Sequence, residues 1–349
     1  MTPGGPARDG ADVLSPDETD DAFDNGVVAL ARTCDVVRVA GRDALSYLQS
    51  QCTQDLSGLR DGGSAESLLL SPQGRVDAYV RVVRLGEHEA LVVGPTGSGE
   101  AVASRLQRFR LRVKAECEQL GWPCVLVRGP GSSALAGSAA PGVVVLPVER
   151  GRAVGFDLVG PGASVPDGVP LGDPETFAAL RIESGEPLPG SEIGEKTIPQ
   201  EIGVVERAVS FTKGCYPGQE LVARIDARGG HVPRQLRGVL VEASGRVELP
   251  GELVLDGRVV GELTSLAWSV RAGGPVALAL VRREVEPPAT VVLRAGAAPS
   301  DGADGPGRPG TVSPVWPARV LRLPLAGPGG TGPGRAGTSR SADPGAGER

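Results

Sequence analysis

The spacing of apolar positions changes near residue 235, and this change divides the chain into two parts. Before it, apolar residues recur at helical spacing over 45–52 and 99–109. Apolar runs at 76–85 and 90–93 indicate strands, and apolar residues alternate with polar ones over 111–117, which predicts another strand. Helices mixed with strands in this way predict an α+β body.

Another helix is indicated by its start. Asp173 is a good cap residue, Pro174 suits the first helical turn, and Gly185 is a suitable stop. Within this segment Phe177, Leu180 and Glu183 follow one another at a spacing of three, so they should lie along one side of the helix.

Short β segments dominate the second part. They lie at 236–243, 252–260, 276–281, 290–294 and 318–323. Asp256-Gly257 is a favoured two-residue hairpin turn. We therefore expect a small C-terminal β-barrel.

The amino-acid composition indicates where the folded part of the chain begins and ends. Residues 1–25 and 327–349 are rich in Gly, Pro and charged residues without apolar periodicity, and we expect both to be disordered tails. The predicted domains are thus a body at 26–234 and a barrel at 235–326, which carries a Gly/Pro-rich insertion near 296–313.

Charge and hydropathy narrow the class of protein. The 349 residues carry 36 basic and 42 acidic side chains, a net charge of −6, which argues against a general nucleic-acid binder. No apolar run approaches the roughly 20 residues that span a bilayer, and the start lacks the order of a secretory signal. We expect no membrane association.

The number and spacing of the cysteines indicate the cellular compartment. The five cysteines are scattered and odd in number, which makes a disulfide framework improbable and favours a reducing cytoplasm. No Cys/His group has the spacing of a metal or iron–sulfur site, so no metal ligands are predicted.

The loop at 213–220 is the strongest candidate for chemistry. Glycines flank Cys215, and Lys213 places a positive charge two residues away, which favours the thiolate. Gln219 and Glu220 either orient the thiol or contact a ligand, or else cap the following segment. The structural alternative for the whole loop is a tight turn whose cysteine merely packs.

Glu183 is the second candidate, because a carboxylate at the end of an apolar stripe needs a partner. A pterin ring, with an N–H and an amino group side by side, offers a bidentate one. From the residues alone, an ion pair with Arg181 or another arginine is the favoured interpretation.

These segments resemble a known family. The string K-G-C-Y-x-G-Q-E at 213–220 resembles the signature of YgfZ-type proteins, which belong to the folate-binding superfamily of the glycine-cleavage T-protein. The pattern R-x-E-x-G at 181–185 is similar to that superfamily's pterin-binding motif. The segments 47–55, 70–75, 192–201 and 261–265 resemble further family stretches. The resemblance covers about 26–325.

The resemblance implies a site and its ligand. The fold would be the three-lobed T-protein architecture, with two ferredoxin-like α+β lobes and a C-terminal β-barrel around tetrahydrofolate. Glu183 would hold the pterin, and Cys215 with Lys213 would act at the cleft. Asp77 aligns with an aspartate implicated in T-protein catalysis, although it could be a strand-face charge. The remaining implied folate contacts are Arg181, Thr53, Asp55, Tyr216, Gln219 and Glu220, of which Thr53 and Asp55 would serve as well in capping.

Three functions follow from this resemblance. The first is an accessory factor for the maturation or repair of iron–sulfur cluster proteins, which acts through an activated Cys215 at the folate cleft. It would bind tetrahydrofolate, or a one-carbon derivative of it, and its partners would be iron–sulfur client or assembly proteins. The second is a folate-dependent aminomethyltransferase or other one-carbon transferase, which Asp77 would favour. The third is a module that binds folate or a client and performs no chemistry.

Overall fold

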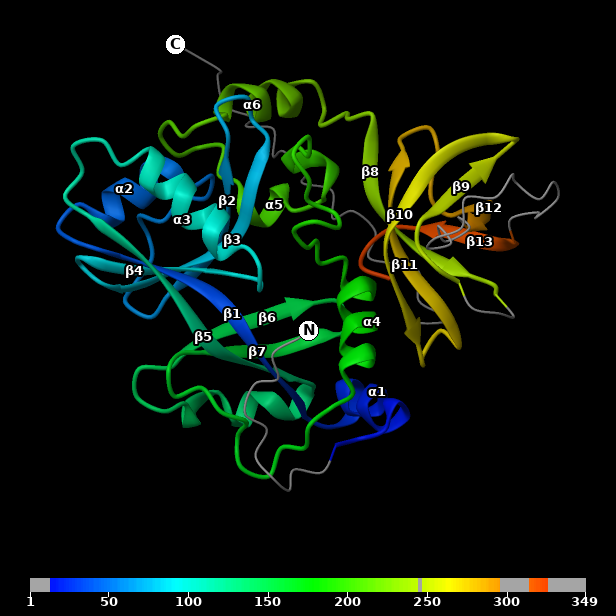
Figure 1. Cartoon of the computed structure of the whole chain (residues 1–349), viewed down its shortest axis with the longest axis horizontal. Coiled ribbons are helices and arrows are strands. Elements are labelled where there is room, and N and C mark those ends of the chain that lie inside the picture. Colours follow the sequence, from blue (N-terminus) through cyan, green and yellow to red (C-terminus); the bar gives the residue numbers. More distant parts are fainter. Residues whose placement is uncertain (1–12, 244–246, 296–313, 326–349) are drawn as a thin grey trace, which may run out of the picture.

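The computed structural model describes residues 13–243, 247–295 and 314–325 (Figure 1). The predicted α+β class with a C-terminal barrel is confirmed. The predicted insertion at 296–313 and the predicted tail at 327–349 lie outside the described residues.

The body contains one continuous seven-stranded antiparallel sheet. Its order is β2-β3-β4-β1-β5-β7-β6. The strands are β1 (Val28–Ala40), β2 (Ser64–Leu70), β3 (Val76–Gly86), β4 (Glu89–Gly94), β5 (Glu116–Arg128), β6 (Val144–Arg150) and β7 (Ala153–Val159). β1 and β5 pair along their whole length, from Val28 opposite Arg128 to Ala40 opposite Glu116. This long ladder joins β2–β4 to β6 and β7 within the sheet.

Helices cover separate parts of the sheet. α2 (Ala44–Gln51) and α3 (Gly99–Arg108) contribute to one apolar core, whereas α1 (Pro16–Asn25) and α4 (Pro174–Ser184) contribute to another. Five short elements complete the body: η1 (Pro130–Ala134), η2 (Ala136–Ser138), η3 (Pro199–Glu201), α5 (Val205–Ala208) and α6 (Gln219–Ala227).

The C-terminal strands close into a barrel. Its order is β10-β11-β8-β13-β12-β9. The strands are β8 (Arg234–Val241), β9 (Gly251–Leu255), β10 (Arg258–Ser269), β11 (Gly274–Arg282), β12 (Ala289–Ala295) and β13 (Val315–Leu321). Asp256 and Gly257 form the predicted turn, with φ of 49° and 75° as a type I′ hairpin requires.

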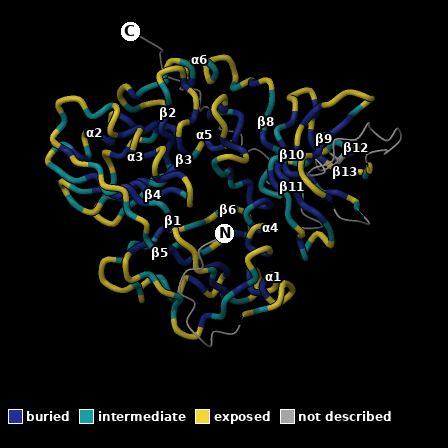
Figure 2. Tube along the Cα trace, in the orientation of Figure 1, coloured by how far each residue is buried: buried dark blue, intermediate teal, exposed yellow. Residues whose placement is uncertain are grey.

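The helix α4 connects the two units. It packs against β10 and β11 of the barrel and against β7 of the body (Figure 1). Figure 2 shows that the strands of both units are largely buried and that exposed residues gather in the connections. As predicted, Asp173 caps α4 by accepting the Thr176 N–H at 2.8 Å, and Gly185 ends it with φ of 71°.

The prediction of a disordered tail over 1–25 is wrong for residues 16–25, which form α1; residues 1–12 lie outside the described part. Ser15 and Glu18 make a reciprocal capping box at its start. Phe23 then packs edge-on against Phe177 of α4, with ring centroids 5.1 Å apart. An acidic composition concealed this short helix because tertiary packing stabilises it.

The predicted strand over 111–117 is also wrong in part. β5 begins only at Glu116, and Leu111 is exposed. Arg112 adopts a left-handed conformation with φ of 58°, which interrupts an extended run. Separately, no helix within the described residues is long and apolar enough to cross a membrane.

Candidate ligand cavity and cysteine loop

A cavity of about 350 Å³ lies on the body's sheet, and all seven strands and α4 contribute to its wall. Part of the wall is apolar and includes Leu30, Leu126, Leu146 and Phe177. The polar part carries five arginines, Arg32, Arg81, Arg128, Arg150 and Arg181, against three carboxylates, Glu66, Asp157 and Glu186. The wall therefore has an excess of positive charge and suits an amphipathic anion.

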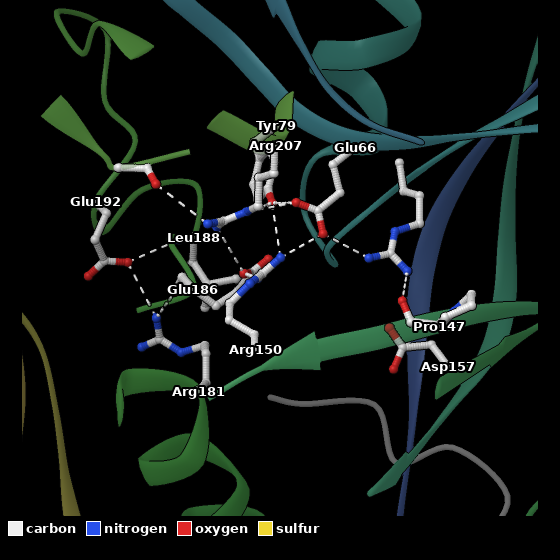
Figure 3. Close-up of polar contacts among 12 residues, drawn as sticks. Glu66, Tyr79, Pro147, Arg150, Asp157, Arg181, Glu186, Leu188, Glu192 and Arg207 are labelled. Carbon is white, nitrogen blue, oxygen red and sulfur yellow. Dashed lines mark hydrogen bonds and ion pairs between the residues drawn. The ribbon is translucent and has the colours of Figure 1, made fainter. Parts of the chain in front are cut away.

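Glu66 is the centre of the polar wall (Figure 3). Its Oε1 accepts from Arg81 at 2.9 Å and from Arg150 at 2.6 Å, and its Oε2 accepts from Arg207 Nε at 2.7 Å and from the Tyr79 hydroxyl. Burial alone would raise the pKa of Glu66, but these partners outweigh it and lower the pKa. Glu66 is thus a fixed carboxylate.

The same arginines contact a second carboxylate. Glu186 pairs with Arg150, and Arg207 Nη2 lies 3.6 Å from Glu186 Oε2. Burial lowers the pKa of Arg150 and raises the pKa of Tyr79, because each would lose hydration in its charged form.

Arg181 connects this wall to the barrel. Its Nη1 donates to the Glu186 carbonyl at 2.8 Å and lies 3.4 Å from Glu192 Oε2 (Figure 3). Glu192 is fully buried and accepts from Ser265 at 2.6 Å and from Thr264 at 2.7 Å. The barrel segment 261–265 that the sequence singled out thus supplies hydroxyl groups to a buried carboxylate.

Ser184 carries an unsatisfied group. It lines the cavity, is 5% exposed, and its Oγ makes no hydrogen bond within the described part of the chain. Buried hydroxyls are normally hydrogen-bonded. Together with the excess of arginine, this orphan hydroxyl fits a polar, anionic ligand in the cavity.

Glu183, which the family motif associates with the pterin, does not line this cavity. Its Oε1 accepts from Ser269 at 2.5 Å, and its Oε2 lies 3.3 Å from Arg152 Nη1. Phe177 and Leu180 are buried with it, as the spacing of three predicted. Arg181 and Ser184 of the same motif line the cavity instead. The ion pair of Glu183 with Arg152 is the pairing with an arginine that the sequence left open.

The ammonium group of Lys213 is held by backbone carbonyl groups. Its ammonium donates to the carbonyls of Gln49, Cys52 and Gln54 at 2.6, 2.7 and 3.0 Å. A lysine has three protons to donate, so all are used at the C-terminal end of α2, where a cation is favourable. Burial lowers the pKa of Lys213. These contacts provide no direct hydrogen bond to Cys215.

Cys215 itself is exposed, on the loop that precedes α6. Gly218, with φ of 78°, anchors that loop against the turn at 71–75, since a Cβ there would lie 2.6 Å from the Ser71 carbonyl. Gly74 faces it with the same φ. Cys215 does not line the cavity, so the structure does not bring it together with Glu183 at a single ligand site.

The other predicted folate contacts are mostly structural. Thr53 is buried and donates to the Ala208 carbonyl at 2.6 Å. Asp55 forms a local turn, and the Ser57 N–H lowers its pKa most, followed by the hydroxyl of Ser57 and the amide of Gln49. Tyr216 lies in an apolar core, and burial raises its pKa to about 12.

Gln219 and Glu220 lie in the first turn of α6, and their role stays a prediction. Asp77 accepts from the buried Arg105 at 3.0 Å and is absent from the cavity wall. Burial raises the pKa of Asp77, against the opposing effect of Arg105.

Sequence reasoning missed the polar wall. Glu66, Tyr79 and Arg150 come from three strands, and Arg207, which contacts them from outside the wall, comes from a short helix. Arg81 gave a signal, as a charge inside an apolar run. A second depression, about 560 Å³ and more open, lies on the barrel beside Arg234, Val259 and Arg283. It includes none of the predicted site residues.

Comparisons with known sequences agree with this fold. The family model of the GCVT N-terminal domain matches residues 26–143, and that of the glycine cleavage T-protein C-terminal barrel domain matches residues 234–296. Together these matches span more than half of the chain.

Individual relatives are more distant. A chloroplastic protein of Arabidopsis thaliana, provisionally named a transferase, is 25% identical over 77% of this chain and 68% of its own. A mitochondrial homologue of the iron–sulfur cluster assembly factor IBA57 from Chaetomium globosum is 29% identical over 62% of this chain and 58% of its own. The tRNA-modifying protein YgfZ of Pectobacterium atrosepticum is 25% identical over 55% and 64%.

A solved structure shows the same architecture. The glycine cleavage system aminomethyltransferase T from Bartonella henselae superimposes with a TM-score of 0.71 over 86% of both chains, at 18% identity, which supports the fold alone. With both family domains present in order, the chain belongs to the glycine-cleavage T-protein (GcvT-like) family as a member of the YgfZ type.

Proposed function

We propose that this protein is a tetrahydrofolate-binding accessory factor for the maturation or repair of iron–sulfur proteins, with the folate held in the central cavity. The observation that carries the proposal is the division of that cavity into an apolar wall and an arginine-rich wall. Folate has the same division, because its flat rings lie at one end of the molecule and its carboxylates at the other.

The residues present fit such a ligand. Leu126, Leu146 and Phe177 supply apolar surface for the rings. Arg150 and Arg181 supply cations, and the Ser184 hydroxyl is a free donor. When bound, tetrahydrofolate supplies a carrier for one-carbon units; the chain's own contribution is to bind and orient it.

The partners are inferred from relatives. An iron–sulfur cluster assembly factor and YgfZ proteins are among the chain's relatives. An exposed thiol on a loop fixed by Lys213 and Gly218 is accessible to a client protein, and we assign to Cys215 the contact with the client's cluster or its intermediates. All five cysteines are free, which supports work in a reducing cytoplasm.

An aminomethyltransferase has less support in this structure. Its proposed acid, Asp77, pairs with Arg105 and is not part of the cavity wall. Folate-dependent turnover of a methylated amine that is lost in Asp77→Asn would favour that activity over the accessory role.

Calorimetry with tetrahydrofolate tests the proposal. Ala178 lies on the exposed surface of α4 and lines the cavity, so Ala178→Trp should block binding without disturbing the core. The control is Glu175→Trp, an exposed position on the same helix outside the cavity wall. We expect micromolar binding to the wild type and to the control, and a loss of roughly tenfold or more in Ala178→Trp.

Two results would contradict this assignment. No binding to the wild type would exclude the folate function. Binding that weakens in Glu183→Gln but not in Ala178→Trp would move the pterin to Glu183 and away from the cavity. For the thiol, normal complementation by Cys215→Ser in cells lacking the protein would remove its proposed role.

A further inference from the structure

We propose that Glu186 occupies an anion subsite of the cavity as an internal substitute, and that a carboxylate of the bound ligand displaces it. This inference rests on the proposed folate binding, and the ligand group concerned is the glutamate end of the folate. The subsite is formed by Arg150 and Ser184 of the cavity wall, next to the fixed carboxylate of Glu66; Arg207 is not on that wall but contacts both Glu66 and Glu186.

The two carboxylates of this cluster are held to different degrees. Glu66 accepts hydrogen bonds from four side chains, and its side chain is 16% exposed. Among the residues that the structure describes, the Glu186 carboxylate pairs with Arg150 and, at 3.6 Å, with Arg207, and its side chain is 31% exposed. Glu186 is therefore the carboxylate that can be exchanged.

Only the side chain needs to move. The Glu186 N–H donates to the Arg181 carbonyl at 3.1 Å, and its carbonyl accepts from Arg181 Nη1 at 2.8 Å. Gly185 makes the left-handed turn that ends α4 just before it. With the backbone held on both sides, rotation of the Glu186 side chain frees Arg150 and Arg207 and leaves the loop in place.

Two hydrogen-bond donors in this cluster have no acceptor among the described residues. One is the Ser184 hydroxyl, 5% exposed and on the cavity wall. The other is the buried Arg207 Nη2, which lies 3.6 Å from Glu186 Oε2, beyond hydrogen-bond distance. A donor of this kind is costly to bury without an acceptor, and an anionic oxygen in the cavity would satisfy it.

The net charge of this cluster also favours an anionic ligand. Arg81, Arg150 and Arg207 face Glu66 and Glu186, which leaves one positive charge in excess in a partly buried cluster. A ligand with two carboxylates would supply more negative charge than Glu186 does, and bidentate pairing with a guanidinium suits a carboxylate. A phosphate group has the same acceptor chemistry, and the test separates the two.

The experiment compares two probes by calorimetry on the full chain. Tetrahydrofolate carries the glutamate carboxylates, and 6-methyltetrahydropterin carries the ring without any carboxylate. We expect Glu186→Gln to raise the affinity for tetrahydrofolate by about threefold or more, and Ser184→Ala to lower it by about three- to tenfold. Neither variant should change the affinity for 6-methyltetrahydropterin. The matched control is Glu175→Gln, on the exposed side of α4.

Each result has a distinct meaning. If the wild type binds neither probe, the folate proposal fails. If it binds both but Glu186→Gln binds tetrahydrofolate more weakly or unchanged, Glu186 is not a displaceable substitute, while folate binding stands. If pyrophosphate binds more tightly than tetrahydrofolate and Ser184→Ala weakens it, the subsite accepts phosphate and the carboxylate assignment is wrong. Thermal unfolding of each variant confirms that the fold is retained.

Discussion

Ser265 of the barrel donates a 2.6 Å hydrogen bond to Glu192, a carboxylate of the segment that follows α4. Thr264 donates to the same oxygen, while the Leu188 N–H and Arg181 contact the other one. This fully buried carboxylate therefore connects the barrel, α4 and the polar wall of the cavity.

Replacing Glu192 by alanine should destabilise the protein strongly. Glu192→Ala removes the carboxylate partner of the partly buried Arg181 and leaves the Leu188 N–H and the Ser265 hydroxyl without this acceptor, whereas Thr264 keeps the Leu278 carbonyl. We expect a loss of about 3 kcal/mol or more in the free energy of unfolding, measured by urea denaturation. Glu195→Ala, an exposed neighbour, should stay within about 0.5 kcal/mol of the wild type. Equal effects at both positions would refute the role of Glu192.

Two glycines of the cysteine loop should differ in their tolerance of a methyl group. Gly218 has φ of 78°, and a Cβ there would lie 2.6 Å from the Ser71 carbonyl, whereas nothing lies within 4 Å of a Cβ at Gly214. Gly218→Ala should cost about 1–3 kcal/mol of stability. Gly214→Ala should be close to neutral. A harmless Gly218→Ala would show that the contact between the two turns does not position the loop.

Cys215 should be the fast-reacting thiol of the native protein. Cys34, Cys52 and Cys124 are buried, and burial raises the pKa of Cys52 to about 11 and that of the half-buried Cys117 above its ordinary value. Only thiolates alkylate readily. Mass spectrometry after brief iodoacetamide treatment at pH 7.5 should locate the label at Cys215, and Cys215→Ser should abolish it. The label should persist in Cys117→Ser; rapid labelling elsewhere in Cys215→Ser would contradict the described burial.

The ion pair between Asp24 of α1 and Arg152 should stop stabilising the protein at low pH. Arg152 lowers the pKa of Asp24 by hydrogen bonding, against a smaller opposing effect of burial and with help from Arg271. The lowered pKa means that this stabilisation is present above the ordinary value of 3.8 and is lost as pH falls through the pKa of the folded protein. Because Asp24 is 43% exposed, the contribution should be only about 0.5–1 kcal/mol.

The comparison is urea unfolding of the wild type and Asp24→Asn at several pH values. The variant should be less stable at pH 7, and the difference should disappear at a pH below the folded-state pKa of Asp24. Asp21→Asn, on the exposed side of α1, controls for charge removal. A difference that persists unchanged in acid would mean that the carboxylate of Asp24 is not responsible.

Local patterns in the sequence determined much of the architecture. The cap at Asp173 and the stop at Gly185 define α4 because both act within a few residues of the backbone they satisfy. Asp256-Gly257 specifies its hairpin for the same reason. The cysteine of the glycine-flanked loop at 213–220 is exposed, as its functional interpretation required.

The partners of the charged residues were decided by the tertiary structure. Glu183 pairs with Arg152 and Ser269, and Lys213 with carbonyls of the segment at 49–54, although each could have made other contacts as far as the sequence shows. The polar wall joins Glu66, Tyr79 and Arg150, and Arg207 contacts Glu66 from outside it; sheet register and helix packing bring these residues together from distant segments. Hydrophobic periodicity acts locally and is legible in one chain, whereas the choice of an ion's partner depends on which surfaces meet after folding.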